Sequence, residues 1–441
     1  MSFPRYPIYK NSDVEWLGQV PAHWNVISIK WLSPVKRGAS PRPIDDPKYF
    51  DGDGEFAWVR IADVSACDGI LAGTTQQLST LGSSLSVKVA PGELFVSIAG
   101  TVGKPCISAI KACIHDGFVY FPTLEIDPKF LYRIFEGGTC YGGLGKWGTQ
   151  LNLNTDSIGS IRVALPPSDE LKQVLAFLDR ETAKIDGLVA EQRQLMALLK
   201  EKRQAVISHA VTRGLNPDAP TKPSGIEWLG DVPEHWQVVP LKYLCLLLKD
   251  GTHLPPERVD EGVPLLSVRN LIDGEFNLRS DDSMISEDSY QALCRAFVPK
   301  EEDVLLAIVG ATLGKTAVVP DGLGPFHIQR SVAIFRTRQK VLRARFLNLV
   351  FQCGPFQALL WEMVGYSAQP GIYLGTLENI RIPVPPVDEQ TRMLESTSVK
   401  INELINLTAE AQRAIDLLQE RRTALISAAV TGQIDVRTVN D

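Results

Sequence analysis

The sequence predicts an α+β fold in which two mixed α/β globular domains are joined by two long antiparallel coiled-coil helices. Three observations predict it. Blocks from the first half of the chain return in the same order in the second half, the centre of each half holds short β-type runs broken by glycine and proline, and each half ends in a long proline-free segment with heptad spacing. We therefore expect one structural unit used twice, related by an internal pseudo-twofold axis.

The composition is that of a folded protein without membrane segments. With 441 residues, 44% of them hydrophobic, the chain should form two to four domains. Its first ten residues contain no apolar segment, and its apolar runs fall far short of the roughly 20 residues that cross a bilayer. Seven cysteines without a C-x-x-C pair indicate neither a disulfide framework nor a zinc site. We expect a cytoplasmic protein.

The net charge argues weakly against nucleic-acid binding. The chain has 45 Lys and Arg against 51 Asp and Glu, which gives a formal charge of −6. Neutralising phosphates requires clustered basic residues, so the distribution of charge matters more than its sum.

Internal repetition is the strongest signal in the chain. The block EWLGQVPAHW at 15–24 returns as EWLGDVPEHW at 227–236, with eight identities in ten positions and an offset of 212. Later blocks repeat at offsets up to 219, so the centres of the halves diverge while their flanks keep their length. These later pairs are IAGTVGK (98–104) with IVGATLGK (308–315), IRVALPPSDE (161–170) with IRIPVPPVDE (380–389), and EKRQAVISHAVT (201–212) with ERRTALISAAVT (420–431).

The repeats divide the chain into alternating frame and variable segments. The variable modules lie at 25–165 and 237–384, where short β-type runs alternate with short helical pieces. The frame consists of an N-terminal segment at 1–24, a first helix at 166–212, a proline-rich linker with the second copy of the repeated block at 213–236, a second helix at 385–432 and a tail at 433–441.

Each predicted helix carries a heptad seam about five heptads long. Acidic residues at 169–170 and 388–389 mark the helix starts, and Gly214 and Gly432 mark the ends. Such a helix needs a partner for its apolar seam, and the other copy is the obvious one. The alternative is that each helix packs only on its own globular domain. The predicted seam residues are Leu171, Leu175, Leu178, Ile185, Val189, Met196 and Leu199 in the first helix, and Leu394, Ile401, Leu404, Ile415 and Leu418 in the second.

Candidate DNA-contacting residues concentrate in loops of the two modules. The loops 145–154 and 365–373 are both glycine-rich and carry an aromatic residue and a glutamine. Gln and Asn can contact adenine and Arg can contact guanine, so such loops could read base edges. The alternative is a packed Trp147 with turn-forming glycines. The candidates are Lys36, Arg37, Arg42, Arg60, Lys104, Lys146, Gln150 and Asn152 in the first module and Arg269, Lys315, Arg330 and Gln369 in the second, and Arg336 is a further basic residue there.

Catalytic and metal-binding motifs are not apparent in the sequence. The run GATLGKT at 310–316 has three residues between its glycines where a P-loop has four, so a tight turn between two strands explains it better. The six histidines lack metal-ligand spacing, and we expect His23 and His235, which lie in the repeated block, to pack in the frame. We expect no catalytic residue and no metal site in this chain.

Together, the repeated frame motifs resemble a known family. Each half is entered through WLGxVPxHW, leaves its module through PPxDE, and ends in a helix closing with ExRxAxIS. This pattern resembles the DNA-specificity subunits of bacterial type I restriction-modification systems over nearly the whole chain. The first half departs from the commoner Glu-Gln after the prolines, because Leu171 follows Glu170.

The resemblance implies a function and a set of partners. Each variable module would be a target-recognition domain that reads one half of a bipartite, asymmetric site in double-stranded DNA. The helices would set the spacer length and dock two methyltransferase (modification) subunits, with restriction motor-nuclease subunits joining to cleave. S-adenosylmethionine, Mg and ATP would belong to those partners, so this chain would hold no cofactor and would not be an enzyme.

A second function class remains open from the residues alone. Duplicated coiled-coil frames could form an adaptor that holds two protein partners without reading DNA. Specific DNA affinity that falls steeply with salt would separate the reader from the adaptor.

Overall fold

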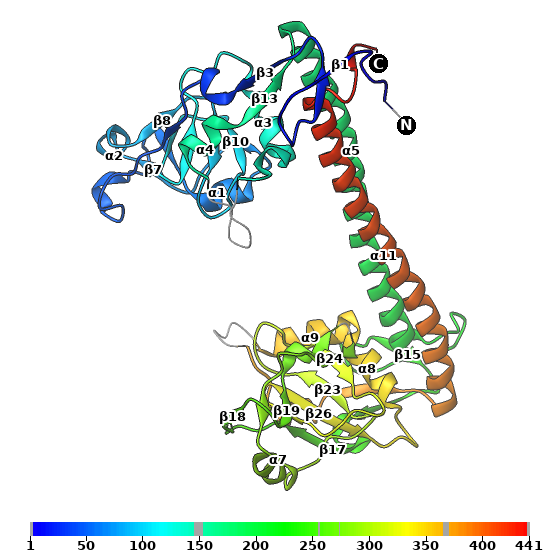
Figure 1. Ribbon diagram of the computed structural model, residues 1–441. Helices are drawn as coiled ribbons and strands as arrows, with labels where there is room; N and C mark the ends of the chain where they lie inside the picture. Colours follow the sequence, from blue (N-terminus) through cyan, green and yellow to red (C-terminus); the bar gives the residue numbers. More distant parts are fainter. Residues whose placement is uncertain (1–2, 145–152, 255, 273, 365–369, 439–441) are drawn as a thin grey trace. The chain divides into compact units, whose positions relative to one another are not determined.

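The computed structural model describes residues 3–144, 153–254, 256–272, 274–364 and 370–438. The chain forms two compact units, and each contains parts of both long helices. Unit 1 consists of the chain up to Gln192 together with the segment from Arg413 onward, and unit 2 consists of Arg193–Gln412 (Figure 1). Among the described residues, no helix is both long and apolar enough to cross a membrane.

The module of unit 1 is built on two mixed sheets. A five-stranded sheet has the order β4-β12-β9-β10-β6 and a four-stranded sheet the order β7-β5-β11-β8. Pairing is antiparallel except for β10 with β6 and β11 with β5. The bounds are β4 Lys36–Arg37, β5 Phe56–Val59, β6 Ile70–Leu71, β7 Gln77–Leu78, β8 Val87–Val89, β9 Leu94–Ser97, β10 Pro105–Ser108, β11 Ala112–Ile114, β12 Phe118–Tyr120, α1 Ile61–Ala66, α2 Thr80–Ser84, α3 Pro128–Gly137 and α4 Thr155–Ser160.

The module of unit 2 repeats this plan. Its sheets have the orders β17-β26-β23-β24 and β18-β22-β19-β25, and β19 pairs in parallel with β25 as β5 does with β11. The bounds are β17 Cys245–Asp250, β18 Arg258–Val259, β19 Val263–Leu266, β20 Leu271–Ile272, β21 Glu275–Phe276, β22 Met284–Ile285, β23 Val304–Ala307, β24 Thr316–Val318, β25 His327–Ile328, β26 Val332–Thr337, α6 Leu241–Leu244, α7 Glu287–Cys294, α8 Ala344–Gln352, α9 Gly354–Val364 and α10 Leu374–Leu377.

The frame consists of short two-stranded ribbons and two long helices. The helices are α5 Ser168–Arg213 and α11 Val387–Val430. The strands that lead into them, β13 Arg162–Leu165 and β27 Arg381–Val384, pair antiparallel with β3 Asn25–Ser28 and β16 Gln237–Pro240. The repeated blocks contribute two further ribbons, β1 Tyr9–Asn11 with β2 Gln19–Pro21, and β14 Thr221–Pro223 with β15 Asp231–Pro233.

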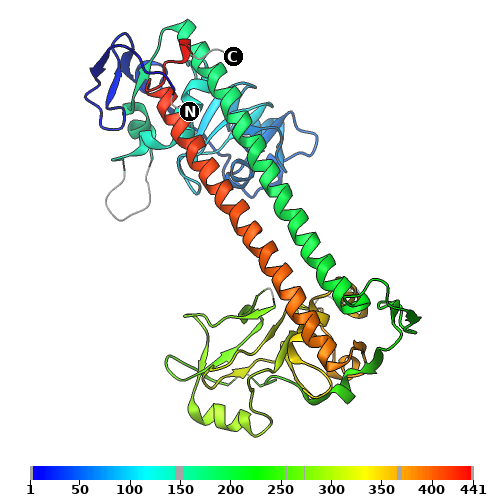
Figure 2. The ribbon, with the colours of Figure 1, turned by 90° about the vertical axis from the view of Figure 1, so that its right-hand side faces the viewer.

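The two helices pack against each other in antiparallel orientation, as predicted (Figure 2). In unit 1, Arg422 of α11 binds Asp186 of α5 with an Nε–Oδ1 distance of 2.8 Å. In unit 2, residues near the end of α5, such as Val211, share a core with Met393 near the start of α11. All twelve predicted seam residues are buried or half-buried. The alternative in which each helix packs only on its own domain is therefore wrong.

A carboxylate in the first turn of each long helix connects it to the repeated block. Glu170 is buried and accepts hydrogen bonds from the Trp24 Nε1–H (2.9 Å) and the Tyr6 hydroxyl (2.5 Å) on one oxygen. Its other oxygen lies 2.8 Å from His23 Nε2. Because a carboxylate can only accept, the imidazole donates. His23, which was predicted to pack in the frame, thus makes a specific polar contact with Glu170. Tyr6 and Trp24 donate to the same carboxylate.

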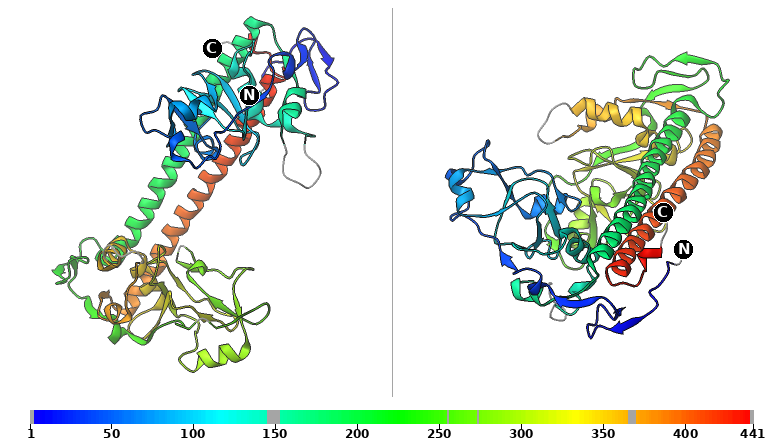
Figure 3. Two further views of the ribbon diagram at one scale, coloured as in Figure 1. Left: turned by 90° about the vertical axis from the view of Figure 1, so that its left-hand side faces the viewer. Right: turned by 90° about the horizontal axis from the view of Figure 1, so that it is seen from above.

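The second copy repeats this contact with the same atoms. Glu389 accepts from Trp236 Nε1 at 3.1 Å and lies 2.7 Å from His235 Nε2. The end of the other helix lies against the same tryptophan in each unit. Gly214 and Gly432 both have positive φ, and a Cβ on Gly432 would lie 2.3 Å from Pro21 Cδ. Each joint therefore gathers one helix start, one helix end and one repeated block (Figure 3).

The two copies differ at the next residue. Gln390 is fully buried and donates to the carbonyls of Val341 and Pro385, while its oxygen accepts from the Arg343 N–H. Leu171 at the matching position is a buried apolar side chain. At this position, the start of α11 is therefore bound to its module by hydrogen bonds. The start of α5 is held there by apolar packing instead.

The joint in unit 1 predicts a pH-dependent loss of stability on substitution of Glu170. Burial alone would raise the pKa of Glu170, but the hydrogen bonds from Tyr6, His23 and Trp24 outweigh it and hold that pKa below its usual value. The ionised carboxylate therefore stabilises the fold above the unfolded pKa of about 4.3, and this contribution is lost as the pH falls through the folded pKa. Glu170→Gln should lower the free energy of unfolding at pH 7 by about 1–3 kcal/mol.

The neighbouring carboxylate provides the control for this measurement. Asp169 has a side chain 93% exposed, and Asp169→Asn should change stability by less than about 0.5 kcal/mol. Denaturant unfolding from pH 7 down to about pH 2.5 should show the deficit of Glu170→Gln constant above the unfolded pKa and shrinking below it, as the pH falls through the folded pKa. A deficit that stays constant over this range, or that Asp169→Asn matches, would contradict the role given to Glu170.

Candidate nucleic-acid interface

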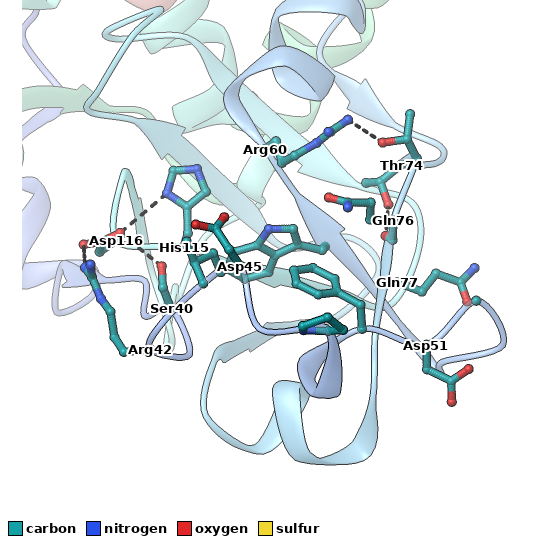
Figure 4. Close-up of a pocket in the computed structure, with 16 residues that line it drawn as sticks. Ser40, Arg42, Asp45, Asp51, Arg60, Thr74, Gln76, Gln77, His115 and Asp116 are labelled. Atoms are coloured by element: carbon teal, nitrogen blue, oxygen red, sulfur yellow. Dashed lines mark hydrogen bonds and ion pairs between the residues drawn. The ribbon is translucent and has the colours of Figure 1, made fainter.

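The first module has a wide polar cleft at the ends of β5 and β11. Its volume is about 1010 Å³. Two predicted residues, Arg42 and Arg60, line it (Figure 4). Sequence reasoning missed the other lining residues, which come from four separate segments of the chain: Ser40, Ile44, Asp45, Pro47, Phe50, Asp51, Gly52, Trp58, Thr74, Thr75, Gln76, Gln77, His115 and Asp116.

Arg60 is held in place at the cleft by the residues around it. It precedes α1, and its backbone N–H donates to Asp63 Oδ2 at 2.9 Å. The guanidinium lies 3.3 Å from the same carboxylate and also donates to the Thr75 hydroxyl. Because these contacts fix its direction, Arg60 is oriented before any ligand arrives.

The opposite side of the cleft combines donors and acceptors. Asp116 accepts from Ser40 Oγ at 3.1 Å and from Arg42 Nη2 at 3.0 Å. Burial acts to raise the pKa of Asp116, but Ser40, Arg42 and Arg37 hold it below its usual value. Burial lowers the pKa of His115, against the opposing effect of Asp116, so its ring is neutral at pH 7. Neutral rings, carboxylates and guanidinium groups together suit polar base edges better than phosphate alone.

Backbone hydrogen bonds identify the matching positions in the second module. Ala39 N–H donates to the Ile114 carbonyl as Thr252 N–H donates to that of Ile328, and Gly38 N–H donates to Phe118 as Gly251 N–H does to Val332. A Cβ on either glycine would lie within 2.2 Å of a carbonyl oxygen, so this close strand approach requires glycine in both modules. The side chains on this shared backbone differ. Ser40 corresponds to His253 and Arg60 to Ser267, while His115 corresponds to Gln329 and Asp116 to Arg330.

The predicted residues of the second module have different surroundings. Arg330 is exposed, and its backbone N–H donates to Thr252. Arg269 is bound by Asp281 (3.0 Å) and Asp282 (3.3 Å), so its charge is largely balanced. Lys315 is exposed in the turn between β23 and β24. Backbone bonds from Gly310 to Pro370 and from Ile372 to Ile308 place that turn beside residues 370–372.

The remaining predicted residues fall into three groups. Lys36 and Arg37 are exposed on β4, and Arg37 also donates to the Asp116 carbonyl. Lys104 has a structural contact, because its ammonium group donates to the carbonyls of Ser65 and Cys67 at the end of α1. Four candidates lie outside the described residues: Lys146, Gln150, Asn152 and Gln369.

Arg336 is part of the core of its module, which corrects its sequence-based interpretation as a loop residue. It lies in β26, and its guanidinium binds Asp303 at 2.7 and 2.8 Å and also donates to the Val298 carbonyl. The Asp303 side chain is fully buried. A charged partner is required there, because an unpaired buried carboxylate is strongly destabilising.

No group of three or more potential metal ligands is found among the described residues. The repeated glycine runs at 98–104 and 308–315 form tight turns between antiparallel strands, as their spacing indicates.

Truncation of two arginines of the second module should change the free energy of unfolding by very different amounts. Arg336→Ala leaves Asp303 buried and unpaired, and it should lower the free energy of unfolding by about 3 kcal/mol or more. Arg330→Ala removes an exposed side chain and should change it by less than about 0.5 kcal/mol. Thermal and denaturant unfolding of the two variants checks this. Equal destabilisation by both would contradict the division between structural and surface arginines.

Comparisons with known proteins agree with this architecture. Residues 233–416 match a family model described as the type I restriction modification DNA specificity domain. The MjaVIII specificity subunit of Methanocaldococcus jannaschii is 24% identical over 353 residues, which cover 79% of this chain and 78% of that protein. The EcoBI specificity subunit of Escherichia coli is 24% identical over 293 residues, covering 65% of this chain and 61% of that protein.

A solved structure shows the same fold. A chain from a study of complex assembly and conformational transition of the type I R-M system superimposes with a TM-score of 0.66 at 17% identity, covering 93% of this chain and 98% of that one. The duplicated frame and the paired helices of this chain are consistent with these similarities. Residues 233–416 thus match the DNA specificity domain of type I restriction-modification systems, and the chain as a whole is similar to specificity subunits of such systems in sequence and in fold.

Proposed function

We propose that this chain reads a bipartite, asymmetric site in double-stranded DNA, with each module reading one half-site. The observation that carries the proposal is the shared backbone with different polar side chains. A module backbone that is repeated at the level of its hydrogen bonds serves the same mechanical role twice, whereas different side chains at matching strand ends select different bases.

Partner subunits complete the proposed function. The chain directs methyltransferase (modification) subunits and restriction motor-nuclease subunits to the site that it reads, in the cytoplasm. S-adenosylmethionine, Mg and ATP act in those partners. The long paired helices act as the element that sets the spacing between half-sites, because about 1.5 Å of rise per residue converts helix length into distance along the duplex.

The charges of the modules suit recognition of DNA by arginine side chains of fixed direction more than by general attraction to phosphates. Arg42, Arg60 and Arg269 are all paired with carboxylates. Such pairing fixes the direction of each guanidinium but weakens its attraction to phosphates. We therefore expect modest DNA affinity for the chain alone, with tight binding once partner subunits add positive surface around the duplex.

Replacing residues 25–165 by the module of another specificity subunit tests the proposal. The hybrid, assembled with its methyltransferase subunits, should select DNA in which one half-site has changed while the other half-site keeps its sequence. Selection from a randomised duplex library measures this. The reciprocal replacement of 237–384 is the matched control and should change the other half-site.

Three outcomes would contradict the proposal. If both half-sites change together, modular readout is wrong. If neither changes, the bases are read outside the modules. If the wild-type assembly shows no specific, salt-sensitive DNA binding, the adaptor alternative is supported.

A further inference from the structure

Two cysteine sulfur atoms lie in contact inside the first module. The Sγ atoms of Cys67 and Cys106 are 3.6 Å apart, and the Cys67 thiol donates to the Val64 carbonyl at 3.4 Å. Among the seven cysteines, all of which are free and lie in the described part of the chain, no other two sulfur atoms are in hydrogen-bond contact. The contact therefore distinguishes this pair from the remaining thiols.

The backbone brings the two residues together from different elements. Cys67 directly follows α1, and Cys106 is the second residue of β10. The strand β6 pairs in parallel with β10, and the Ile107 N–H donates to the Gly69 carbonyl at 2.9 Å. Because this pairing lies next to both cysteines in the chain, it holds their sulfur atoms close together in the folded module.

The two thiols differ in their access to solvent. Cys67 is half-buried, whereas Cys106 is fully buried. Burial raises the pKa of the Cys106 thiol, the Cys67 thiol acts in the same direction, and Lys104 opposes both. A buried, protonated thiol reacts poorly with a dissolved oxidant, so an oxidant reacts with Cys67 first. Cys106 then lies beside the oxidised sulfur, in the position of a resolving thiol.

The position that matches Cys106 in the second module has no thiol. The ladder of β23 with β24 places Ala317 opposite Leu305, as the ladder of β9 with β10 places Cys106 opposite Phe95. Ala317 and Cys106 are both fully buried. The shared module fold therefore accommodates alanine at this position, and packing alone does not require a cysteine there.

We propose that Cys67 and Cys106 are an oxidation site of the first module, at which a peroxide closes a reversible disulfide. The deprotonated Cys67 sulfur attacks one peroxide oxygen, the O–O bond breaks, and Cys67 becomes a sulfenic acid while the departing hydroxide takes up the thiol proton to form water. The Cys106 sulfur then attacks the Cys67 sulfur, the S–O bond breaks, and a second water leaves with the Cys106 proton. Two thiols and one peroxide thus give one disulfide and two waters. A dithiol reductant restores both thiols by exchange.

Closing the disulfide requires only a small movement. The sulfur–sulfur distance falls from 3.6 Å to about 2.05 Å. Cys67 lies at the end of a helix of six residues and beside the exposed Asp68. Because a short helix end opens more readily than a strand inside a sheet, Cys67 makes this movement while Cys106 stays in place.

The disulfide ties the end of α1 to the five-stranded sheet. It closes the segment 67–106, which contains residues 74–77 of the polar cleft, and Arg60 lies at the other end of α1. Such a cross-link removes conformational freedom from the unfolded chain and so stabilises the folded one. Oxidation should therefore raise the thermal midpoint by about 5 °C or more, whatever DNA sequence the chain reads.

Thiol counting on the full chain tests this site. The reduced wild-type chain is treated with hydrogen peroxide under native conditions, its remaining thiols are alkylated, and its peptides are identified by mass. Two of the seven free thiols should be lost, in one cross-linked peptide that joins Cys67 to Cys106. Dithiothreitol should restore all seven thiols and return the thermal midpoint to its starting value.

Three variants separate the pair from the other thiols. Cys67→Ser should keep all of its thiols under the same treatment. Cys106→Ala, which introduces the residue that the second module has at the matching position, should stop at a sulfenic acid on Cys67 that dimedone labels. Cys294→Ser removes the other half-buried cysteine and should still form the cross-link. Thermal midpoints of the reduced variants show that each is folded.

Four results would overturn the inference. The folded wild-type chain could keep all seven thiols, or form the cross-link only in denaturant. Cys67→Ser could lose two thiols as the wild type does, which would place the reaction elsewhere. Oxidation could stop at Cys67 in the wild type without joining Cys106. Finally, the oxidised chain could unfold at the same or a lower temperature than the reduced chain, which would show that the bond does not stabilise the module.

Discussion

The architecture depends on one carboxylate in the first turn of each long helix. Glu170 and Glu389 accept hydrogen bonds from the tryptophan and histidine of a repeated block, and the glycine that ends the other helix lies against the same tryptophan. An acidic side chain at a helix start is favoured by the helix dipole, and here it also satisfies a buried indole N–H. The contact therefore fixes where one helix begins and where the other ends.

This constraint leaves the modules free to diverge. Each module enters and leaves the frame through a two-stranded ribbon with a fixed register, β3 with β13 and β16 with β27. Beyond the ribbon, the backbone contacts that require Gly38 and Gly251 are kept, while the side chains at the strand ends differ. Side chains at the strand ends of a module can thus differ without disturbing the frame.

The sequence could predict the features that have a local or repeated signature. The heptad steps from Leu171 to Leu199 identify a buried seam, and the eight identities of the repeated block identify a frame. The polar cleft could not be predicted, because Gln76, His115 and Asp116 come together only in the folded sheet, although the polar run at 74–77 is a signal in hindsight. Lys104 and Arg336 were interpreted as basic loop residues, but both have structural partners. Nothing in the sequence marks a basic residue as having such a partner.

In the function that we propose, two different modules on one frame define a DNA target in two parts. The most direct measurement maps methylated adenines across the genome of the native strain and of a strain that lacks this chain. We expect a methylated motif that disappears in the second strain and consists of two defined parts of different sequence, separated by a spacer of fixed length and undefined sequence. An unchanged methylation pattern, or a lost motif that is continuous or a perfect palindrome, would contradict it.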